Sequence, residues 1–230
     1  MNTTAPTVLL HGALNNASVW RPVLAQLPSA LALDLPGHGA NHEPPLGSIA
    51  ALADWVWTEL DRRSITTAVL VGHSMGSLIA LEAAARQPER AMGLVMVGTA
   101  FPMRVSPALL EMAAQNPAQA LALIDDYSRS LPDLGQQLLQ LMQREHARDP
   151  GLLALDLGLC NGYADALEAA ARVRCPVQLI LGEIDRMTPP RKAETLAEAL
   201  KARVHVLKAG HALMSEATAT VAQILKETRP

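Results

Sequence analysis

The sequence contains little cysteine, few aromatic side chains and no marked excess of either charge. Its 230 residues include two cysteines and 3% aromatic residues, and the 18% of residues that are charged leave a net charge of −3. Because lysine and arginine are scattered rather than clustered, we expect neither a nucleic-acid-binding stripe nor a polybasic membrane anchor. The expected partners are small molecules, not nucleic acids or membranes.

The cysteines and the first residues bear on where the protein works. Cys160 and Cys175 have no metal or redox spacing, and two buried thiols are typical of a reducing cytoplasm. The opening MNTTAPTVLLHG has no basic region before a long apolar run, and no later run reaches membrane-spanning length. We therefore expect a cytoplasmic protein without a secretory signal. The histidines lack metal-ligand spacing, so no metal and no cofactor are expected.

Six short apolar runs recur along the chain, with amphipathic stretches between most of them. The runs are residues 7–10, 30–35, 68–72, 93–98, 177–182 and 204–210. Such runs are typical of parallel strands buried on both faces, with the intervening helices as cover. Thr188 is expected to cap the helix after the fifth run, with Pro189 at its first position. The pattern predicts an α/β fold built on a doubly wound parallel sheet.

Residues 101–175 interrupt this alternation. They are rich in leucine and methionine, are punctuated by prolines and contain no convincing strand. We predict a core domain formed by residues 1–100 and 176–230, and a helical cap, residues 101–175, inserted after the fourth strand. Some of the cap's apolar residues should form its own core and a minority should face the crevice: Leu109, Leu110, Met112, Leu121, Ile124, Leu138, Leu139 and Met142. An insertion packed away from the crevice is the alternative.

A serine stands where the third apolar run meets a helix-like run. Residues 72–76 read GHSMG, so Ser74 lies between Gly72 and Gly76. A sharp strand-to-helix turn strains its central residue and brings strand and helix so close that side chains two positions away would clash. Glycines avoid that clash, and the turn lifts the serine hydroxyl onto the sheet's rim. Ser74 is therefore the candidate nucleophile.

A serine hydroxyl needs a base, and the base needs a carboxylate to fix its tautomer. His211 follows the last apolar run, and Asp185 lies three residues beyond the end of the preceding run. All three residues fall at the carboxyl edge of one parallel sheet, so they can converge. Glu183 is an alternative acid, although Asp185 is better placed beyond the strand. The spacing predicts a catalytic triad of Ser74, Asp185 and His211.

Five segments now stand in order: VLLHG, DLPGHG, GHSMG, LGEID and AGH. Together they resemble the α/β-hydrolase family over nearly the whole chain. The resemblance implies an oxyanion hole made by the backbone N–H groups of Ala13 and Met75, with Leu14 as the alternative to Ala13. The sequence also differs from the family in one respect. Family members usually carry two further strands before the first motif, whereas only six residues precede Thr7.

The expected sheet therefore has six strands, all parallel, with residues 30–35 at one edge. An exposed edge strand is a pairing liability and is one route to a homodimer.

Three further histidines are expected to have structural roles. His11 is expected to anchor its own loop, His38 to be structural, and His73 to be packed or hydrogen-bonded beneath the turn. Arg104, Arg129 and Arg148 are either isolated solvated side chains or contacts for an anionic substrate.

The predicted function is that of a serine hydrolase. It would cleave a small-to-medium carboxylic ester, or a thioester or lactone, with an apolar acyl or alcohol part, through an acyl-enzyme on Ser74. Fold and triad alone do not separate this reaction from carbon–carbon bond hydrolysis, lyase chemistry or acyl transfer. A ligand-binding protein with a slow triad is a further alternative.

Overall fold

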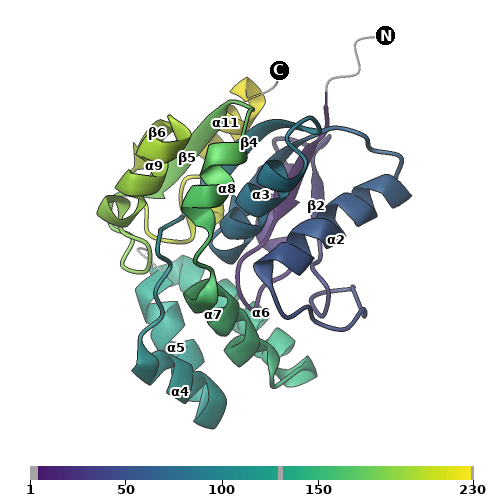
Figure 1. The fold of residues 1–230 in the computed structure, drawn as a ribbon. Helices are drawn as coiled ribbons and strands as arrows, with labels where there is room; N and C mark the ends of the chain where they lie inside the picture. The colour runs from purple at the N-terminus through teal and green to yellow at the C-terminus, as the bar shows by residue number, and fades with distance from the viewer. Residues whose placement is uncertain (1–4, 129–131, 229–230) are drawn as a thin grey trace.

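The computed structural model describes residues 5–128 and 132–228, and its centre is one six-stranded parallel sheet (Figure 1). The strands are β1 (Thr7–Leu10), β2 (Leu31–Leu33), β3 (Ala68–His73), β4 (Ala91–Val97), β5 (Val177–Gly182) and β6 (Arg203–Leu207). Their order is β2-β1-β3-β4-β5-β6, and every neighbouring pair is parallel. This confirms the predicted doubly wound α/β sheet, with the second apolar run at an edge.

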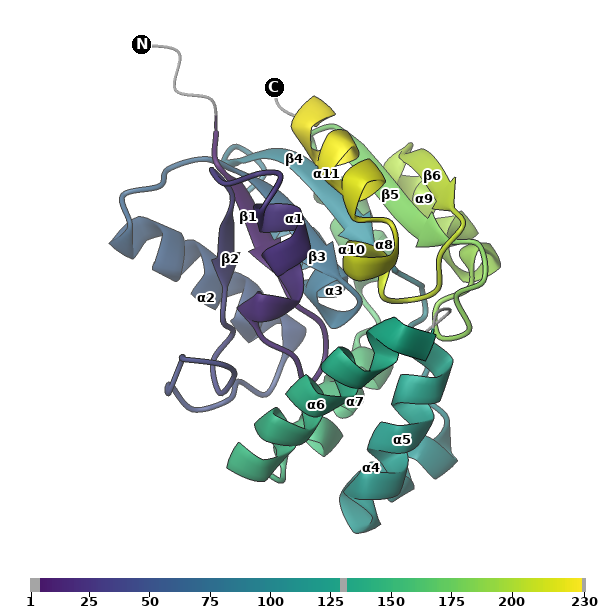
Figure 2. The ribbon, with the colours of Figure 1, turned by 180° about the vertical axis from the view of Figure 1, so that it is seen from behind.

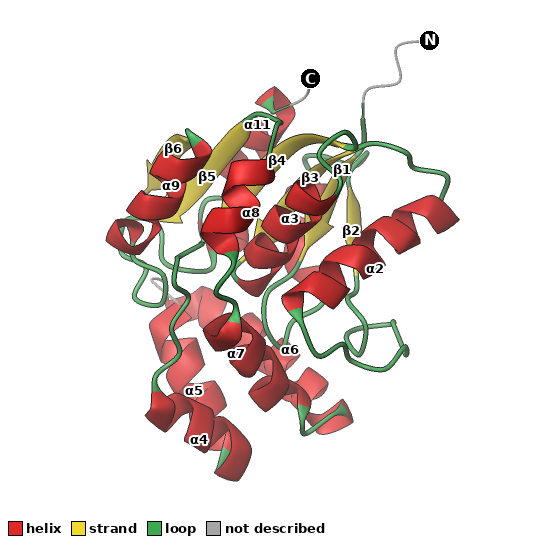
Figure 3. Cartoon of the chain, viewed as in Figure 1, coloured by secondary structure: helices red, strands yellow, loops and turns green. Residues whose placement is uncertain are grey.

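Helices cover both faces of the sheet because strand residues alternate between two apolar clusters. On one face lie α2 (Ile49–Arg62), α3 (Met75–Arg86), α8 (Ala166–Arg172) and α9 (Glu194–Leu200), seen in front of the strands in Figure 3. On the other lie α1 (Arg21–Leu24), α10 (Leu213–Glu216) and α11 (Thr218–Glu227), seen in Figure 2. Val8 and Leu10 point into the first cluster, and Leu9 points into the second. The central strands are thus buried from both sides, whereas β6 at one edge is largely exposed.

The segment between β4 and β5 contains helices joined by loops, and no strand, in its described part. It forms α4 (Pro107–Gln115), α5 (Pro117–Ser128), α6 (Pro132–Arg148) and α7 (Leu152–Gly162), followed by α8. The four helices α4–α7, here called the cap helices, lie together beyond one end of the sheet, whereas α8 packs against α3 (Figure 1). They share an apolar cluster of their own. Within the described chain, every helix is too short or too polar to cross a bilayer.

Both cysteines are free thiols, but their surroundings differ from the expectation of two buried groups. Cys160 in α7 is buried, whereas Cys175, just before β5, is only half-buried. Burial still raises the pKa of the Cys175 thiol to about 11. Burial raises the pKa of the Cys160 thiol as well, so neither thiol is ionised near neutral pH.

Candidate active site

The turn between β3 and α3 holds Ser74 in a strained backbone conformation. Its φ and ψ are 53° and −120°, in a region that residues other than glycine rarely adopt. A Cβ atom added to Gly72 would overlap the carbonyl oxygen of Gly76, and one added to Gly76 would lie 2.5 Å from the carbonyl oxygen of His11. The strand, the helix and the loop after β1 therefore meet at van der Waals distance. Only glycines fit at these two positions, and the serine lies on the rim between them.

His211 and Asp185 form a buried hydrogen-bonded pair. The Nδ1–H group of His211 donates to Oδ2 of Asp185 over 2.8 Å, and both residues are buried. Because a carboxylate only accepts, Nδ1 carries the proton, which leaves Nε2 as the basic nitrogen. Burial by itself raises the pKa of Asp185, but the charge and hydrogen bond of His211 and the bonds from Thr188 outweigh it and hold that pKa below its usual range. Asp185 is therefore ionised and orients the imidazole.

Thr188 has a role that sequence reasoning missed. It does not cap a helix, because the next helix, η2 (Pro190–Ala193), begins after Pro189. Its hydroxyl instead donates to Oδ2 of Asp185 over 2.7 Å and lies 3.1 Å from Nδ1 of His211. The backbone N–H groups of Met187 and Thr188 both donate to Oδ1 of Asp185 over 2.8 Å. The aspartate is thus held by the turn that follows it, a pattern that a threonine three residues after an aspartate could have indicated.

The loop that carries His211 is held by two further elements. Its backbone N–H donates to the carbonyl oxygen of Ser128 in α5 over 3.0 Å. The ring of His73 lies 4.7 Å from the ring of His211, and its Nε2–H donates to the carbonyl oxygen of His211 over 2.9 Å. Burial, then the charge of His211, lowers the pKa of His73 to about 3. His73 is therefore a neutral packing partner beneath the turn, in line with its structural interpretation.

Ser74 and His211 line the same pocket, whose volume is about 670 Å³. Among the described residues, no hydrogen bond joins the Ser74 hydroxyl to His211. Catalytic hydrogen bonds are often long in ligand-free enzymes and shorten when substrate binds. The structure thus brings Ser74 and His211 to one cavity and pairs His211 directly with Asp185 behind it.

The loop after β1 supplies backbone N–H groups beside Ser74. The N–H group of Leu14 donates to Oδ2 of Asp156 over 2.8 Å, so it is not free to bind an oxyanion. Within the described chain, the N–H groups of Ala13 and Met75 donate to no acceptor, and Ala13 lines the pocket. Met75 is the first residue of α3, where backbone N–H groups have no partner within the helix. Of the two alternatives from the sequence, Ala13 is therefore better placed than Leu14.

All eight apolar candidates of the cap belong to one apolar cluster, and four of them also line the pocket. Leu109, Ile124, Leu138 and Met142 line the pocket together with Ser74. Leu110, Met112, Leu121 and Leu139 pack within the cap cluster. Apolar residues of the insertion therefore line the pocket that contains Ser74.

The remaining sequence candidates have structural contacts. His11 donates from Nδ1 to the carbonyl oxygen of Gly12 and accepts from the N–H group of Leu35, so it anchors its loop. His38 contacts Asp156. Glu183 is exposed and, among the described contacts, has no hydrogen bond to His211, unlike Asp185. In the described ranges, no cluster of three or more potential metal ligands is present.

The three arginines singled out from the sequence fall into different settings. Arg104 lines the pocket. Arg148 instead donates to the carbonyl oxygens of Gly37 and Gly39 in a core loop. Arg129 lies outside the described residues.

Comparisons with known proteins identify related sequences and folds. A sequence profile described as "Alpha/beta hydrolase family" matches residues 7–224. The chain is 33% identical over 216 residues to the pimeloyl-acyl-carrier-protein methyl ester esterase of Chromobacterium violaceum, covering 84% of this chain and 81% of that protein. A solved thermophilic esterase superposes with a TM-score of 0.83 at 25% identity, over 98% of this chain and 89% of the esterase. The enol-lactonase of Burkholderia xenovorans shares the fold, with a TM-score of 0.84 at 24% identity over 97% and 91% of the two chains.

Proposed function

The chain belongs to the α/β-hydrolase family and is a hydrolase, and we propose that it cleaves a carboxylic ester through an acyl-enzyme formed on Ser74. The observation that supports this most is the hydrogen bond between His211 and the buried Asp185, with His211 in the same pocket as a serine held on a strained turn. An imidazole whose Nδ1–H is held by a carboxylate can accept a proton at Nε2. That is the base a serine nucleophile requires.

The proposed reaction has two halves. The hydroxyl oxygen of Ser74 attacks the ester carbonyl carbon while Nε2 of His211 takes its proton, and Asp185 stabilises the resulting imidazolium. The N–H groups of Ala13 and Met75 bind the oxyanion, and each such donor typically contributes about 3–4 kcal/mol to catalysis. His211 then protonates the leaving alkoxide, and a water molecule, activated by the same histidine, releases the carboxylic acid from Ser74.

Labelling and turnover of simple esters test this proposal. The protein should react stoichiometrically with a fluorophosphonate at Ser74 and should hydrolyse p-nitrophenyl esters of short acids. Ser74→Ala should lose both properties while it retains the wild-type melting temperature. Ser215→Ala is a matched control, because Ser215 is an exposed serine that lines the same pocket. Near wild-type turnover by Ser74→Ala would refute the mechanism.

The same triad could serve carbon–carbon bond hydrolysis, lyase chemistry or acyl transfer, and product analysis separates these reactions. Ester hydrolysis releases one acid and one alcohol, whereas acyl transfer consumes an added alcohol or thiol in place of water. A ligand-binding protein would bind the ester without releasing product beyond one equivalent.

A narrower candidate substrate is a methyl ester of an acyl group attached to a carrier protein, which is the substrate class in the name of the Chromobacterium relative. The observation that favours it is the charge around the pocket. No described lining residue is acidic. Five lining side chains are cationic, namely Arg21, Arg104, Arg144, Arg186 and Lys192. Arg186 pairs with Asp126, but the other four have no acidic partner within the described chain.

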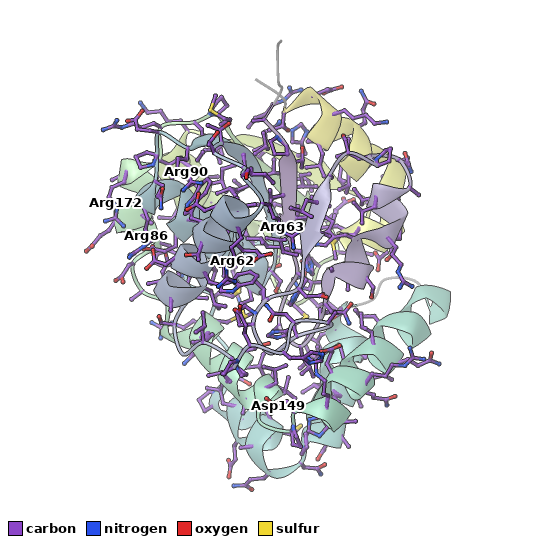
Figure 4. The ribbon with its side chains drawn as sticks, turned by 90° about the vertical axis from the view of Figure 1, so that its right-hand side faces the viewer. Arg62, Arg63, Arg86, Arg90, Asp149 and Arg172 are labelled. Atoms are coloured by element: carbon purple, nitrogen blue, oxygen red, sulfur yellow. The ribbon has the colours of Figure 1, made fainter. Side chains whose placement is uncertain are left out.

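Several arginines away from the pocket are paired with acids. Figure 4 labels Arg62, Arg63 and Arg86 on the α2–α3 side, where they bind Glu43, Glu59 and Asp54. Around the pocket, four of the five cations lack such a partner within the described chain, and a negatively charged carrier would complement them. Arg104→Gln with Arg144→Gln should lower kcat/KM for the carrier-bound ester but not for a small neutral ester. Arg63→Gln is the control, and an equal loss on both substrates would exclude a carrier-binding role.

A further inference from the structure

The loop after β1, residues 12–16, is held from the cap side as well as by the sheet. Leu14 has a φ of 49°, a left-handed conformation that costs a residue with a side chain about 1–2 kcal/mol. Its side chain is fully buried within the cap cluster, against residues such as Leu121 and Leu153. Its backbone N–H donates to the carboxylate of Asp156 in α7 over 2.8 Å. A strained residue next to the proposed oxyanion donor Ala13 is therefore fixed by contacts that come from the cap.

Asp156 is itself held rigidly. Its side chain is buried, and the oxygen that accepts from Leu14 also accepts from Nε2 of His38 over 2.9 Å. The other ring nitrogen of His38 lies 3.0 Å from the carbonyl oxygen of Pro36, so both nitrogens face acceptors and both carry protons. Burial lowers the pKa of His38, but the hydrogen bond and charge of Asp156 outweigh it and raise that pKa above its usual value. The carboxylate is thus one member of a buried ion pair with little freedom to move.

Taking the proposed ester hydrolysis as its basis, we infer that Asp156 is a positioning residue for the oxyanion hole. It acts through the N–H group of Leu14. Ala13 and Leu14 contribute consecutive peptide groups, so fixing the second N–H restricts the directions that the first can take. A hole whose donors are aligned before the reaction is what stabilises the tetrahedral intermediate. The helix that lines the acyl site thereby also sets the geometry of the oxyanion donor.

The structure supplies a matched control in Glu145 of α6. Glu145 is also a buried cap carboxylate, and it binds the same two core loops. Its oxygens accept from the side-chain amide of Asn16 over 2.8 Å and from the N–H group of Gly39 over 3.0 Å. It therefore docks the cap without any bond to the Ala13–Leu14 backbone. A residue that only docks the cap and a residue that aligns the hole should differ in their effects on catalysis.

The experiment compares Asp156→Ala, Asp156→Asn and Glu145→Ala in the full chain, using a p-nitrophenyl ester and a trifluoromethyl ketone that forms an oxyanion on Ser74. Asp156→Ala should lower kcat by about 10–100-fold, a smaller loss than the removal of an oxyanion-hole donor causes. The inhibition constant of the ketone should rise by the same factor. KM should change by less than about threefold. Asp156→Asn has an amide oxygen that still accepts from Leu14. Its kcat and inhibition constant should therefore lie between those of Asp156→Ala and wild type. Glu145→Ala should lower the melting temperature but leave kcat within about threefold.

Equal losses of kcat in Asp156→Ala and Glu145→Ala would show that Asp156 only attaches the cap to the core and does not align the oxyanion hole. That result would overturn the inference. If Asp156→Ala does not fold, Asp156→Asn carries the test, and an unchanged kcat and inhibition constant in it would overturn the inference too. The wild-type and Ser74→Ala proteins are measured alongside. A wild-type protein that hydrolyses no ester would refute the proposed function itself. An activity that depends on Ser74 but does not change in the Asp156 variants would refute only the inference about Asp156.

Discussion

Single residues at the nucleophile turn are constrained by backbone approach rather than by side-chain chemistry. An added Cβ at Gly72 would overlap the Gly76 carbonyl, and the nearest atoms are backbone atoms that cannot rotate away. By contrast, an added Cβ at Gly158, on the exposed side of α7, would meet nothing within 4 Å. The same substitution should therefore have opposite effects at the two positions.

Gly72→Ala should lower the free energy of unfolding by about 1–3 kcal/mol or more, because overpacking against backbone forces strand and helix apart. It should also abolish ester turnover by displacing Ser74. Gly158→Ala should raise the free energy of unfolding by about 0.5–1 kcal/mol, because alanine has less conformational freedom to lose in a helix. Urea unfolding measures both changes. A wild-type stability for Gly72→Ala would contradict the close approach of β3 and α3.

The orientation of Asp185 predicts the effect of an isosteric change. In Asp185→Asn, the amide oxygen should stay at Oδ1, where two backbone N–H groups donate. The NH₂ group then faces Nδ1 of His211 and favours the tautomer whose Nε2 is protonated. That nitrogen can no longer accept the Ser74 proton, and kcat should fall by about 10⁴ as in the analogous triad. Glu183→Gln, at an exposed neighbouring carboxylate, should change kcat little. A larger effect of Glu183→Gln would mean that the acid is misassigned.

At the scale of elements, the cap helices use adjacent residues for different tasks. On α4, Leu109 lines the pocket, whereas its neighbour Leu110 packs only within the cap cluster. A helix turns by 100° per residue, so neighbouring leucines point to different surroundings. Substrate selectivity should therefore follow the pocket-facing positions and not the apolar content of the helix.

Leu109→Ala should change the preference among p-nitrophenyl esters of increasing chain length by about 1–3 kcal/mol, the range that a hydrophobic pocket offers per methylene. Leu110→Ala should lower stability, because it removes packing, yet keep the wild-type chain-length profile. The measurement is kcat/KM across acyl chains of two to ten carbons. An identical profile for both variants would argue that α4 does not contact the acyl group.

At the scale of the whole molecule, buried histidines link stability to pH with opposite signs. Burial, with the charge of His211, lowers the pKa of His73 to about 3. An unfolded chain binds a proton at each histidine near pH 6.5, so the folded state loses stability as pH falls below that value. His38 behaves in the opposite way because its pKa is raised. The stability it contributes is complete below pH 6.5 and is lost as pH rises through its folded pKa.

His38→Gln should therefore destabilise the protein more at pH 6 than at pH 9, because the ion pair with Asp156 that it removes is present only while His38 is protonated. The difference in free energy of unfolding between wild type and variant, measured by urea titration across this range, should shrink as pH rises. His42→Gln, at an exposed histidine in the same loop region, serves as the control. A gap that widens with pH would mean that His38 is neutral in the folded state.

Much of the fold and the candidate site could be predicted because their signals are local. Buried parallel strands need unbroken apolar runs, so β1, β3, β4 and β5 could be predicted almost to the residue. The nucleophile turn needs glycines two positions either side of Ser74 for steric reasons, which GHSMG displays directly. Strand ends in a parallel sheet share one edge, so Asp185 and His211 could be placed beside Ser74 from strand order alone.

Only the tertiary structure decided how these residues are held. The bond from Leu14 to Asp156 joins residues 142 positions apart, and such contacts leave no spacing signal in a sequence. From the sequence, Thr188 could either cap a helix or donate a hydrogen bond to Asp185. The conformation of the loop places its hydroxyl on Asp185. Which cap leucines face the pocket depends on how α4–α7 rotate against the sheet. Local sterics and hydrophobic periodicity are thus written in the sequence, whereas long-range hydrogen bonds and packing rotations exist only once the chain has folded.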